Sequence, residues 1–414
     1  GETAEAPYYK SMTEIIKIGK QKLHDPSSPA HMDRLAVMLF TSGTTGTSKC
    51  VMLSERNICA AINSACESVN FFPHDVLVSV LPIHHTYELC CSLAAANYGC
   101  EIAINDSLRH CMRNFQLFRP TALVLVPLFL STMDKKIWDE IRKKGVESAV
   151  RGLMKASDKV RKVGIDPRRL LFRDILAAFG GRLEKIICGG AALDQKIADD
   201  FRSLGIEVWE GYGITECSPL IAVDVYYHAK PGSVGPAVPC CTVRIDDAAA
   251  DDEGREIGEI CVKGDVVMLG YYKQPELTAE ALRDGWFHTG DLGSIDERGA
   301  LYICGRKKNV IVTANGKNIY PEELETRLAG FEEIGESLVC EAKRGDEPCV
   351  KAKIFPSIAY LRDKLGHEPS TEEIQAEVRN VVQAVNGQMP GYKHIKIVEI
   401  LTEPLEKTTS QKIK

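Results

Sequence analysis

Long hydrophobic runs are missing from this sequence of 414 residues. The longest, from Ala122 to Leu130, includes a proline and is too short to span the roughly 30 Å hydrocarbon core of a bilayer. An excess of basic charge is missing too, since 51 Lys and Arg face 57 Asp and Glu for a net charge of −6. We therefore expect no transmembrane segment and no nucleic-acid partner, while peripheral membrane contact and the oligomeric state stay open.

Paired cysteine motifs are also missing. The 15 cysteines are spread from Cys50 to Cys349 without a CxxC pair, which excludes a compact disulfide scaffold and a cysteine-rich zinc module. The chain starts at Gly1 and shows no apolar signal segment near its start. Free thiols in a reducing environment are therefore the expected state, and the cytoplasm is the expected location.

Short apolar segments of strand length alternate with helix-like segments over the first half of the chain. The expected strands are Leu35–Phe40, Val76–Leu81, Ala122–Pro127, Leu183–Cys188 and Ile206–Trp209, and the expected helices include Met12–Leu23, Asn57–Val69 and 89–98. Buried apolar strands that alternate with helices predict a parallel sheet covered by helices on each side.

Residues 221–303 have a different pattern, with many Gly and Pro, short alternating strands and turn pairs such as Asp284-Gly285 and Arg298-Gly299. This pattern predicts an antiparallel, β-barrel-like subdomain. After Lys308 the chain alternates strand and helix again, which predicts a small α+β domain. The expected fold is therefore α/β, with a large region over 1–307 and a C-terminal domain over 308–414.

The segment Lys135–Arg173 is helical in pattern and carries 13 Lys or Arg against five Asp or Glu. Such a surface could bind an anionic ligand or lipid headgroups. Amphipathic helices with a solvated charged face explain the same composition, and we favour that interpretation over a binding site.

The segment Thr41-Ser-Gly-Thr-Thr-Gly-Thr-Ser-Lys49 follows an apolar strand and combines two glycines, six hydroxyl side chains and a lysine. Glycines let backbone amides turn toward one point, hydroxyls donate further hydrogen bonds, and a lysine adds positive charge, which together suit a polyphosphate. The spacing GxxGxxK differs from the GxxxxGK[ST] of P-loop proteins, so their mechanism is not implied. A plain polar turn would not need this density of hydroxyl groups.

Two further segments suit a nucleotide and its metal ion. In Glu210-Gly-Tyr-Gly-Ile-Thr-Glu216, the tyrosine could stack on a purine, the threonine could bond a phosphate and the last glutamate could hold Mg²⁺. In Trp286-Phe-His-Thr-Gly-Asp291, the acid could accept hydrogen bonds from ribose hydroxyls, with Arg306 supplying donors nearby. Taken alone, a surface carboxylate and a turn-capping Asp explain these segments as well.

Eight motifs occur together in the order in which one family carries them. They are TSGTTGTSK, LPIHHTYE (81–88), GGAAL (189–193), GYGITE, GEICVKGDVVMLGYY (258–272), WFHTGD, GRKKNVIVTANGKNIYPEELE and KTTSQK. Together they closely resemble the adenylate-forming superfamily, which contains acyl-CoA synthetases, nonribosomal-peptide adenylation domains and luciferases. The likeness extends from about residue 33 onward. LPIHHTYE and the ending PLEKTTSQKIK are most similar to bacterial long-chain fatty acid–CoA ligases.

The resemblance implies a role for each matching residue, with ATP, Mg²⁺ and the co-substrate CoA as ligands. The phosphate loop would be formed by Thr41, Ser42, Gly43, Thr44, Thr45, Gly46 and Lys49, the adenine slot by Gly190, Ala191 and Ala192 opposite Tyr212 and Gly213, and the ribose contacts by Asp291 and Arg306. Thr215 would contact the α-phosphate, Glu216 the Mg²⁺ ion, and His85 the substrate carboxylate.

The reaction that the resemblance implies is activation of a fatty acid by ATP to acyl-AMP with release of pyrophosphate, followed by transfer to CoA with release of AMP. Attack of a carboxylate on the α-phosphorus brings two anions together, so cations at the phosphates and Lys412 at the carboxylate would lower the barrier. Rotation of the C-terminal domain about Lys308 would then withdraw Lys412 and place Asn315, Gly316 and Lys317 beside the CoA channel.

Departures from the family pattern are few. Ser48 stands where proline is usual and Gln411 where glycine is usual, and neither change removes a ligand. Family members carry a substantial region before the phosphate loop, so the large adenylation domain over 1–307 is expected to be N-terminally truncated. An acyl–acyl-carrier-protein synthetase and a non-catalytic relative that binds nucleotide or acyl-adenylate stay open as alternatives.

Two other groups of residues have simpler explanations. The adjacent His84 and His85 with Glu88 cannot readily face one ion together, so no metal other than Mg²⁺ is expected. Cys217 follows Glu216 directly, but the family pattern gives that position no catalytic role, and we expect it to serve in packing.

Overall fold

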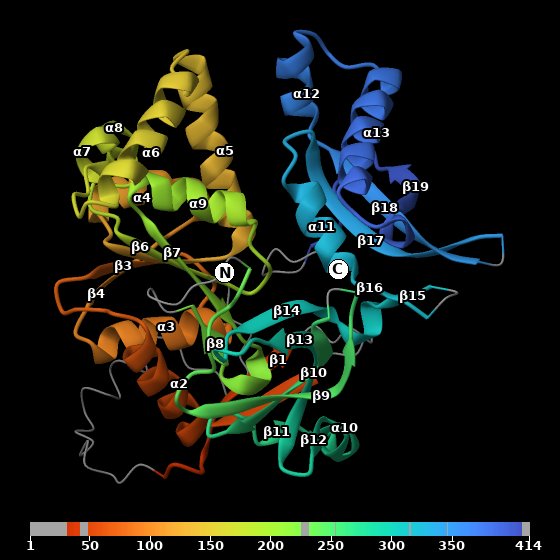
Figure 1. Ribbon diagram of the computed structural model, residues 1–414. Helices are drawn as coiled ribbons and strands as arrows, with labels where there is room; N and C mark the ends of the chain where they lie inside the picture. Colours follow the sequence, from red (N-terminus) through yellow and green to blue (C-terminus); the bar gives the residue numbers. More distant parts are fainter. Residues whose placement is uncertain are drawn as a thin grey trace, which may run out of the picture.

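The computed structural model describes residues 31–41, 49–224, 232–252, 254–313, 316–345 and 347–407, so the expected helix Met12–Leu23 lies outside the described residues. A helix-covered sheet, an antiparallel subdomain and a C-terminal lobe are separate regions in Figure 1. Within the described ranges, no helix is long and apolar enough to cross a membrane. All 15 cysteines carry free thiols, as expected.

A six-stranded sheet forms the centre of the largest region. Its spatial order is β4 (Glu101–Ile104), β3 (Val76–Ser79), β5 (Ala122–Leu125), β6 (Lys185–Gly189), β7 (Glu207–Tyr212) and β8 (Ala222–Val223). The strands from β4 to β7 pair in parallel, and β8 pairs antiparallel with β7. The predicted parallel sheet is therefore confirmed.

Helices cover both faces of this sheet. The helices of this part of the chain are α2 (Glu55–Ser68), α3 (Thr86–Asn97), η1 (Leu108–His110), α4 (Cys111–Phe118), α5 (Pro127–Lys143), α6 (Glu147–Arg161), α7 (Arg168–Leu171), α8 (Arg173–Ala177) and α9 (Gln195–Leu204). Of these, α2 packs with β2, through Ile58 and Ala61, in the core of the antiparallel region. On β5, Leu123 and Leu125 enter a core with side chains of α4, α5 and α9, whereas Ala122 and Val124 enter a second core with α3 (Figure 1). This alternation explains why the strand is apolar at every position.

Two antiparallel sheets form the next region around one shared core. The larger contains β9 (Cys241–Ala250), β10 (Glu256–Gly264), β12 (Leu282–Arg283), β13 (Trp286–Ile295) and β14 (Leu301–Arg306), and the smaller contains β1 (Leu35–Thr41), β2 (Lys49–Ser54) and β11 (Gly270–Tyr271), with helix α10 (Pro275–Ala281) between β11 and β12 in the chain. Leu53 of β2, Ile260 of β10 and Phe287 of β13 meet in that core. The predicted turns at Asp284-Gly285 and Arg298-Gly299 join paired strands, and the antiparallel subdomain is confirmed.

Leu35–Phe40 lies in a strand, β1, but the prediction that this strand belongs to the parallel sheet was wrong. Strand β1 pairs antiparallel with β2, and the glycine-rich segment joins the two strands. Phe40 is 74% exposed and Leu35 42% exposed, so β1 lies at the surface. A short apolar run indicates a strand without identifying its partner, and the mixed sequence of Lys49–Ser54 does not predict β2.

The C-terminal lobe has a hydrophobic core of its own. Its elements are η3 (Lys307–Asn309), β15 (Ile311–Val312), β16 (Asn318–Ile319), α11 (Pro321–Ala329), β17 (Ile334–Arg344), β18 (Glu347–Pro356), α12 (Ile358–Leu365), α13 (Thr371–Gly387), η4 (Gly391–Lys393) and β19 (Ile395–Ile400). Strand β18 pairs antiparallel with β17 and in parallel with β19. Leu324 of α11, Val350 of β18 and Val382 of α13 meet in the core, and α13 begins at a capping box formed by Ser370 and Glu373.

Ion pairs join this lobe to the other two regions. Arg142 of α5 donates to both carboxylate oxygens of Glu332, at 3.1 and 3.3 Å. Lys317, between β15 and β16, donates to both oxygens of Asp252 in the turn after β9, at 3.0 Å. All four side chains are partly exposed, so these contacts position the lobe without merging its core with the others.

A buried ion pair joins the starts of three strands in the parallel sheet. Asp75 precedes β3 and accepts hydrogen bonds from Lys185 Nζ of β6 at 2.7 Å and from Thr121 Oγ1, before β5, at 2.6 Å. Burial by itself would raise the pKa of Asp75, but the hydrogen bonds from Lys185 and Thr121 outweigh it, so the pKa lies below its usual value. The carboxylate is therefore charged and paired at neutral pH.

Close packing also fixes the connection from β7 to β8. A Cβ atom at Gly213 would lie 1.3 Å from the carbonyl oxygen of Pro219, so no larger residue fits unless one of the two segments moves. This glycine therefore determines the path of the chain that carries Thr215 and Glu216.

Lys185→Met should destabilise the chain by about 3–5 kcal/mol, because it leaves the Asp75 carboxylate buried without its cation. Urea unfolding at neutral pH measures the loss, with Lys155→Met on the exposed side of α6 as the control. Since the pKa of Asp75 is depressed in the folded state, the stabilisation is present above the unfolded-state pKa and is lost as the pH falls through the folded-state pKa. A loss at neutral pH no larger than that of the control would contradict this assignment.

Gly213→Ala should lower the unfolding free energy by about 1–3 kcal/mol, because the added methyl group overlaps the Pro219 carbonyl. Gly152→Ala in α6 is the matched control: its Cβ would meet nothing within 4 Å, and we expect it to be neutral or stabilising by up to about 1 kcal/mol. Thermal unfolding followed by circular dichroism compares the two variants. Equal midpoints for Gly213→Ala and the unchanged chain would refute the close approach.

Candidate active site

Asp291 is the centre of the candidate site and joins two regions of the fold. The pairing of β13 with β14 places Asp291 opposite Arg306, whose Nε lies 2.8 Å from Oδ1. Tyr212, at the end of β7, donates its hydroxyl to Oδ2 at 2.7 Å. Burial, followed by the charge of Asp291, raises the pKa of Tyr212, so its hydroxyl stays protonated as a donor. The predicted ribose pair, Asp291 and Arg306, is thus in direct contact with the predicted adenine residue.

Glu216 lies in the short helix η2 (Thr215–Cys217) that follows Gly213. Tyr271 of β11 donates its hydroxyl to Glu216 Oε1 at 3.0 Å. Burial and the neighbouring Glu216 raise the pKa of Tyr271, which keeps that donor protonated. Lys49 Nζ lies over the ring of Tyr271, 4.9 Å from its centre. The side chain of Tyr271 therefore brings the predicted metal ligand and the predicted phosphate-binding lysine to one place.

Three cations converge on this part of the molecule. Burial lowers the pKa of Lys308, and the positive charges of Arg306 and Lys49 lower it further. Within the described residues, neither Lys49 nor Lys308 forms an ion pair. Arg306 is paired with Asp291, whereas the charges of Lys49 and Lys308 suit a polyanionic ligand. Lys308, which we predicted as a hinge, is therefore also part of a cationic group.

The carboxyl ends of the parallel strands carry the predicted adenine slot. Gly189 at the end of β6 pairs with Gly211 near the end of β7, so the loop Gly190–Ala192 leaves the sheet beside Tyr212. Gly190 has a φ of +91°, which favours glycine, and Ala191 and Ala192 are exposed. Ligands of open α/β sheets bind at this edge.

His85 lies at the same edge, at the start of α3. It occupies the N-cap position, and its ring centre is 4.5 Å from that of His84. The next residue, Thr86, is buried and donates its hydroxyl to Thr215 Oγ1 at 3.4 Å. The segment that carries His85 is thus held against the segment predicted to contact the α-phosphate.

The predicted CoA-channel residues belong to a different surface. Gly316, with a φ of +74°, forms the turn before β16, and Lys317 is paired with Asp252 and lies over the ring of Tyr392, 4.5 Å from its centre. Their contacts join the C-terminal lobe to the β9–β10 turn and do not include the residues around Asp291. The third residue of this set, Asn315, lies outside the described residues.

Several predicted site residues cannot be placed. Ser42, Gly43, Thr44, Thr45 and Gly46 of the phosphate loop, together with Lys412, lie outside the described residues. The two ends of that loop are fixed, because Thr41 pairs with Lys49 across the β1–β2 hairpin and its hydroxyl donates to the Lys49 carbonyl at 3.4 Å.

Two residues in the site were not predicted individually. Tyr271 binds Glu216 and supports Lys49, and Thr86 contacts Thr215. Each lies inside a motif that the sequence analysis used, GEICVKGDVVMLGYY and LPIHHTYE respectively, so the motifs located the segments without indicating which side chain acts.

A protein-family model and curated relatives match this chain. A family model described as AMP-binding enzyme matches residues 3–272. The human long-chain-fatty-acid–CoA ligase 1 is 32% identical over 387 residues, which cover 88% of this chain and 54% of that protein. The peroxisomal long chain acyl-CoA synthetase 7 of Arabidopsis thaliana is 33% identical over 329 residues, which cover 76% of this chain and 47% of that protein.

A solved structure gives the same result for the fold. ATP-bound MatB from Rhodopseudomonas palustris superposes with a TM-score of 0.68 at 29% identity, over 92% of this chain and 67% of MatB. The chain spans about half the length of the two curated relatives described above. Because the family model covers more than half of the chain, and eight ordered motifs agree with it, the chain belongs to the AMP-binding, adenylate-forming enzyme family.

Proposed function

We propose that this chain contains the reaction centre of an AMP-forming long-chain fatty acid–CoA ligase, which converts a fatty acid to acyl-AMP and then to acyl-CoA. The observation that carries the proposal is the contact of Asp291 with Tyr212 and Arg306, together with the placement of Glu216 and Lys49 at the side chain of Tyr271. A nucleoside triphosphate needs acceptors at its ribose hydroxyls and cations at its phosphates, and this group offers both side by side.

The nucleoside would lie at Asp291. Tyr212 and Arg306 hold the Asp291 carboxylate in place, and carboxylate oxygens are the acceptors that ribose hydroxyls need. The ring of Tyr212 and the loop Gly190–Ala192 would flank the adenine, since strand pairing brings them to one edge of the sheet.

The phosphates would lie between the β1–β2 hairpin and η2. Lys49 and Lys308 would neutralise them, the loop Ser42–Gly46 would wrap them, and Thr215 would contact the α-phosphate. Glu216 suits a magnesium ion, because carboxylate oxygens are ligands that Mg²⁺ prefers and Tyr271 takes one acceptor position of this carboxylate. When bound, Mg²⁺ would supply charge neutralisation at the phosphates.

The fatty-acid carboxylate would approach from the side of α3, beside His85. Thr86 holds this segment against Thr215, so a carboxylate near His85 would face the α-phosphate. Lys412 would lie between the two anions and reduce their repulsion as the new bond forms. The names of the human and Arabidopsis relatives support a long acyl chain as the substrate.

The two half-reactions would use one site in two arrangements of the lobes, with 1–307 as the adenylation domain, 308–414 as the mobile domain and Lys308 as the hinge. The separate core of the C-terminal lobe supports such a movement. The pairs Arg142–Glu332 and Lys317–Asp252 would have to open, which would free Gly316 and Lys317 to line the channel for CoA.

The partners we propose are a fatty acid, ATP and CoA. The free thiols of all 15 cysteines suit a reducing compartment, and we propose the cytoplasm, while the Arabidopsis relative is named as peroxisomal. An acyl–acyl-carrier-protein synthetase would use the same first half-reaction, with a carrier protein in place of CoA as the acceptor. The assay below distinguishes the two enzymes by adding either CoA or a holo-carrier protein.

This chain should release AMP and pyrophosphate from ATP when a fatty acid of about 8 to 18 carbons is present, and CoA should complete the turnover. The reason is that binding of the acyl chain contributes free energy that can be used to lower the barrier of the reaction at its carboxylate. Released AMP and acyl-CoA are measured with each acid, with and without CoA, and with a holo-carrier protein in its place. ATP binding without any fatty-acid-dependent release would favour the non-catalytic alternative for this chain.

Lys412→Ala should reduce acyl-AMP formation by about 100-fold or more, because the cation between the two reacting anions is lost. Thioester formation from supplied acyl-adenylate should be spared, since Lys412 would be withdrawn in that step. Lys414→Ala, two residues later, is the control and should leave both rates unchanged. Equal loss of both half-reactions in Lys412→Ala would overturn the proposed role.

A further inference from the structure

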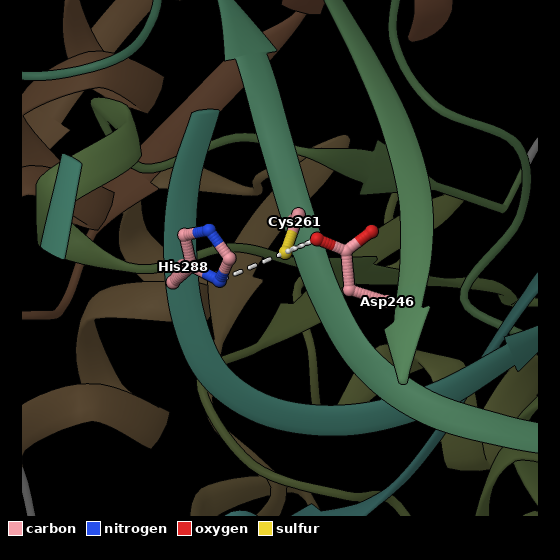
Figure 2. Close-up of side chains that lie close together, drawn as sticks. All are labelled: Asp246, Cys261 and His288. Atoms are coloured by element: carbon pink, nitrogen blue, oxygen red, sulfur yellow. Dashed lines mark hydrogen bonds between the residues drawn. The ribbon is translucent and has the colours of Figure 1, made fainter. Parts of the chain in front are cut away.

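Three side chains able to bind a metal ion meet on the large antiparallel sheet that also carries Asp291. Figure 2 shows Asp246 of β9, Cys261 of β10 and His288 of β13 pointing toward one another. Cys261 Sγ lies 3.3 Å from His288 Nδ1 and 3.5 Å from Asp246 Oδ2. In the part of the chain that the structure describes, this is the one group of three such side chains whose ligand atoms all lie within 4.8 Å.

Strand register holds these side chains together. Cys261 pairs with His288 on one side and with Arg244 on the other, and Asp246 follows Arg244 by two residues, so all lie on one face of the sheet. The neighbouring residues Ile260 and Phe287 point to the opposite face and enter the hydrophobic core. The positions of the three ligands are therefore set by backbone pairing and do not depend on a mobile loop.

Two of the three ligand separations match a tetrahedral metal centre. Zinc bonds of about 2.3 Å to sulfur and about 2.0 Å to nitrogen or oxygen, at tetrahedral angles, separate neighbouring ligand atoms by about 3.5 Å. The two measured separations from Cys261 Sγ are close to that value. A thiolate, an imidazole and a carboxylate also form a ligand set that suits zinc better than magnesium or calcium.

The surroundings allow a cation to enter. The Cys261 side chain is buried, whereas that of Asp246 is 25% exposed, so the group is open to solvent on the side of β9. Glu259 lies 3.5 Å from His288 Nδ1 but is bound to Lys307 at 2.8 Å. With that carboxylate already paired, the fourth position of a tetrahedral ion would be filled by water.

We propose that Asp246, Cys261 and His288 form a zinc-binding site that is separate from the magnesium position at Glu216. Coordination replaces the proton of the Cys261 thiol, which passes to solvent, and no electron transfer is involved. The ion would connect β9 to β13 across β10, and would stabilise the subdomain that carries Asp291. The sequence gives no hint of this site, because its ligands are spaced 15 and 27 residues apart and meet through strand pairing alone.

One neighbouring charge opposes the ion. Arg244 binds Asp246 Oδ2 at 2.8 Å and stacks on the ring of Trp286 at 4.3 Å. A bound cation would compete with this guanidinium for the carboxylate, so Arg244 sets the affinity of the site without being one of its ligands.

Cobalt(II) is the probe that tests the site, because it takes the place of zinc and reports its ligands by colour. The untagged chain, first freed of metal with a chelator, should bind one equivalent of Co²⁺ with the visible bands of a tetrahedral ion and a thiolate-to-cobalt charge-transfer band. Zn²⁺ should displace it. Cys261→Ser should lose the charge-transfer band, and Asp246→Asn and His288→Gln should weaken binding by at least about tenfold.

Two further variants make the test specific. Cys349→Ser, at another buried strand cysteine, should keep the full cobalt spectrum and controls for the loss of a buried thiol. Arg244→Gln should bind Co²⁺ more tightly, because the competing cation is gone. Circular dichroism shows whether each variant is folded. If Cys261→Ser does not fold, the affinity of Asp246→Asn for Co²⁺ decides the test. A charge-transfer band that persists in Cys261→Ser, a spectrum without tetrahedral bands, or unchanged affinity in Asp246→Asn would overturn the proposal.

Discussion

The carboxylate of Asp291 is the constraint on which the rest of the candidate site depends. It is almost fully buried, and a buried charge is tolerated only when it is paired and hydrogen-bonded. Tyr212 and Arg306 meet that requirement from two different regions, the end of the parallel sheet and the last strand of the antiparallel subdomain. The hydrogen bonds to the Asp291 carboxylate therefore align the edge of the parallel sheet with the antiparallel sheet. It also places Arg306, and with it Lys308, within reach of Lys49.

The proposed movement of the C-terminal lobe is compatible with the way the hydrophobic cores are divided. The parallel sheet and the antiparallel subdomain, which carry Glu216 and Asp291, have their own hydrophobic cores, whereas the C-terminal lobe packs around a separate core and touches the other regions through partly exposed charged pairs. Exposed ion pairs contribute little net stability, because water solvates the separated partners nearly as well. A change in the position of the lobe can therefore leave these cores intact and keep the contacts between Asp291 and Tyr212.

Much of the fold could be predicted because its strands have distinctive surroundings. Ala122–Leu125 is apolar at every position since both faces are covered, and Asp284-Gly285 marks a tight turn whatever its tertiary context. The partner of β1 could not be predicted, because an apolar run does not encode whether its neighbour is parallel or antiparallel. For the site, motifs located Asp291, Arg306 and Glu216. The contacts of Tyr271 and the meeting of Cys261 with His288 depend on strand register, which single-sequence patterns do not carry.

The independent core of the C-terminal lobe has an optical consequence. The three tryptophans of the chain, Trp138, Trp209 and Trp286, lie in α5, β7 and β13, and the sequence from residue 308 onward contains none. Intrinsic tryptophan emission therefore reports on residues 1–307 alone, whereas the circular dichroism of the peptide bonds reports on those residues and on the C-terminal lobe together. Recording the two together distinguishes concerted melting from stepwise melting of the lobes without the introduction of any label.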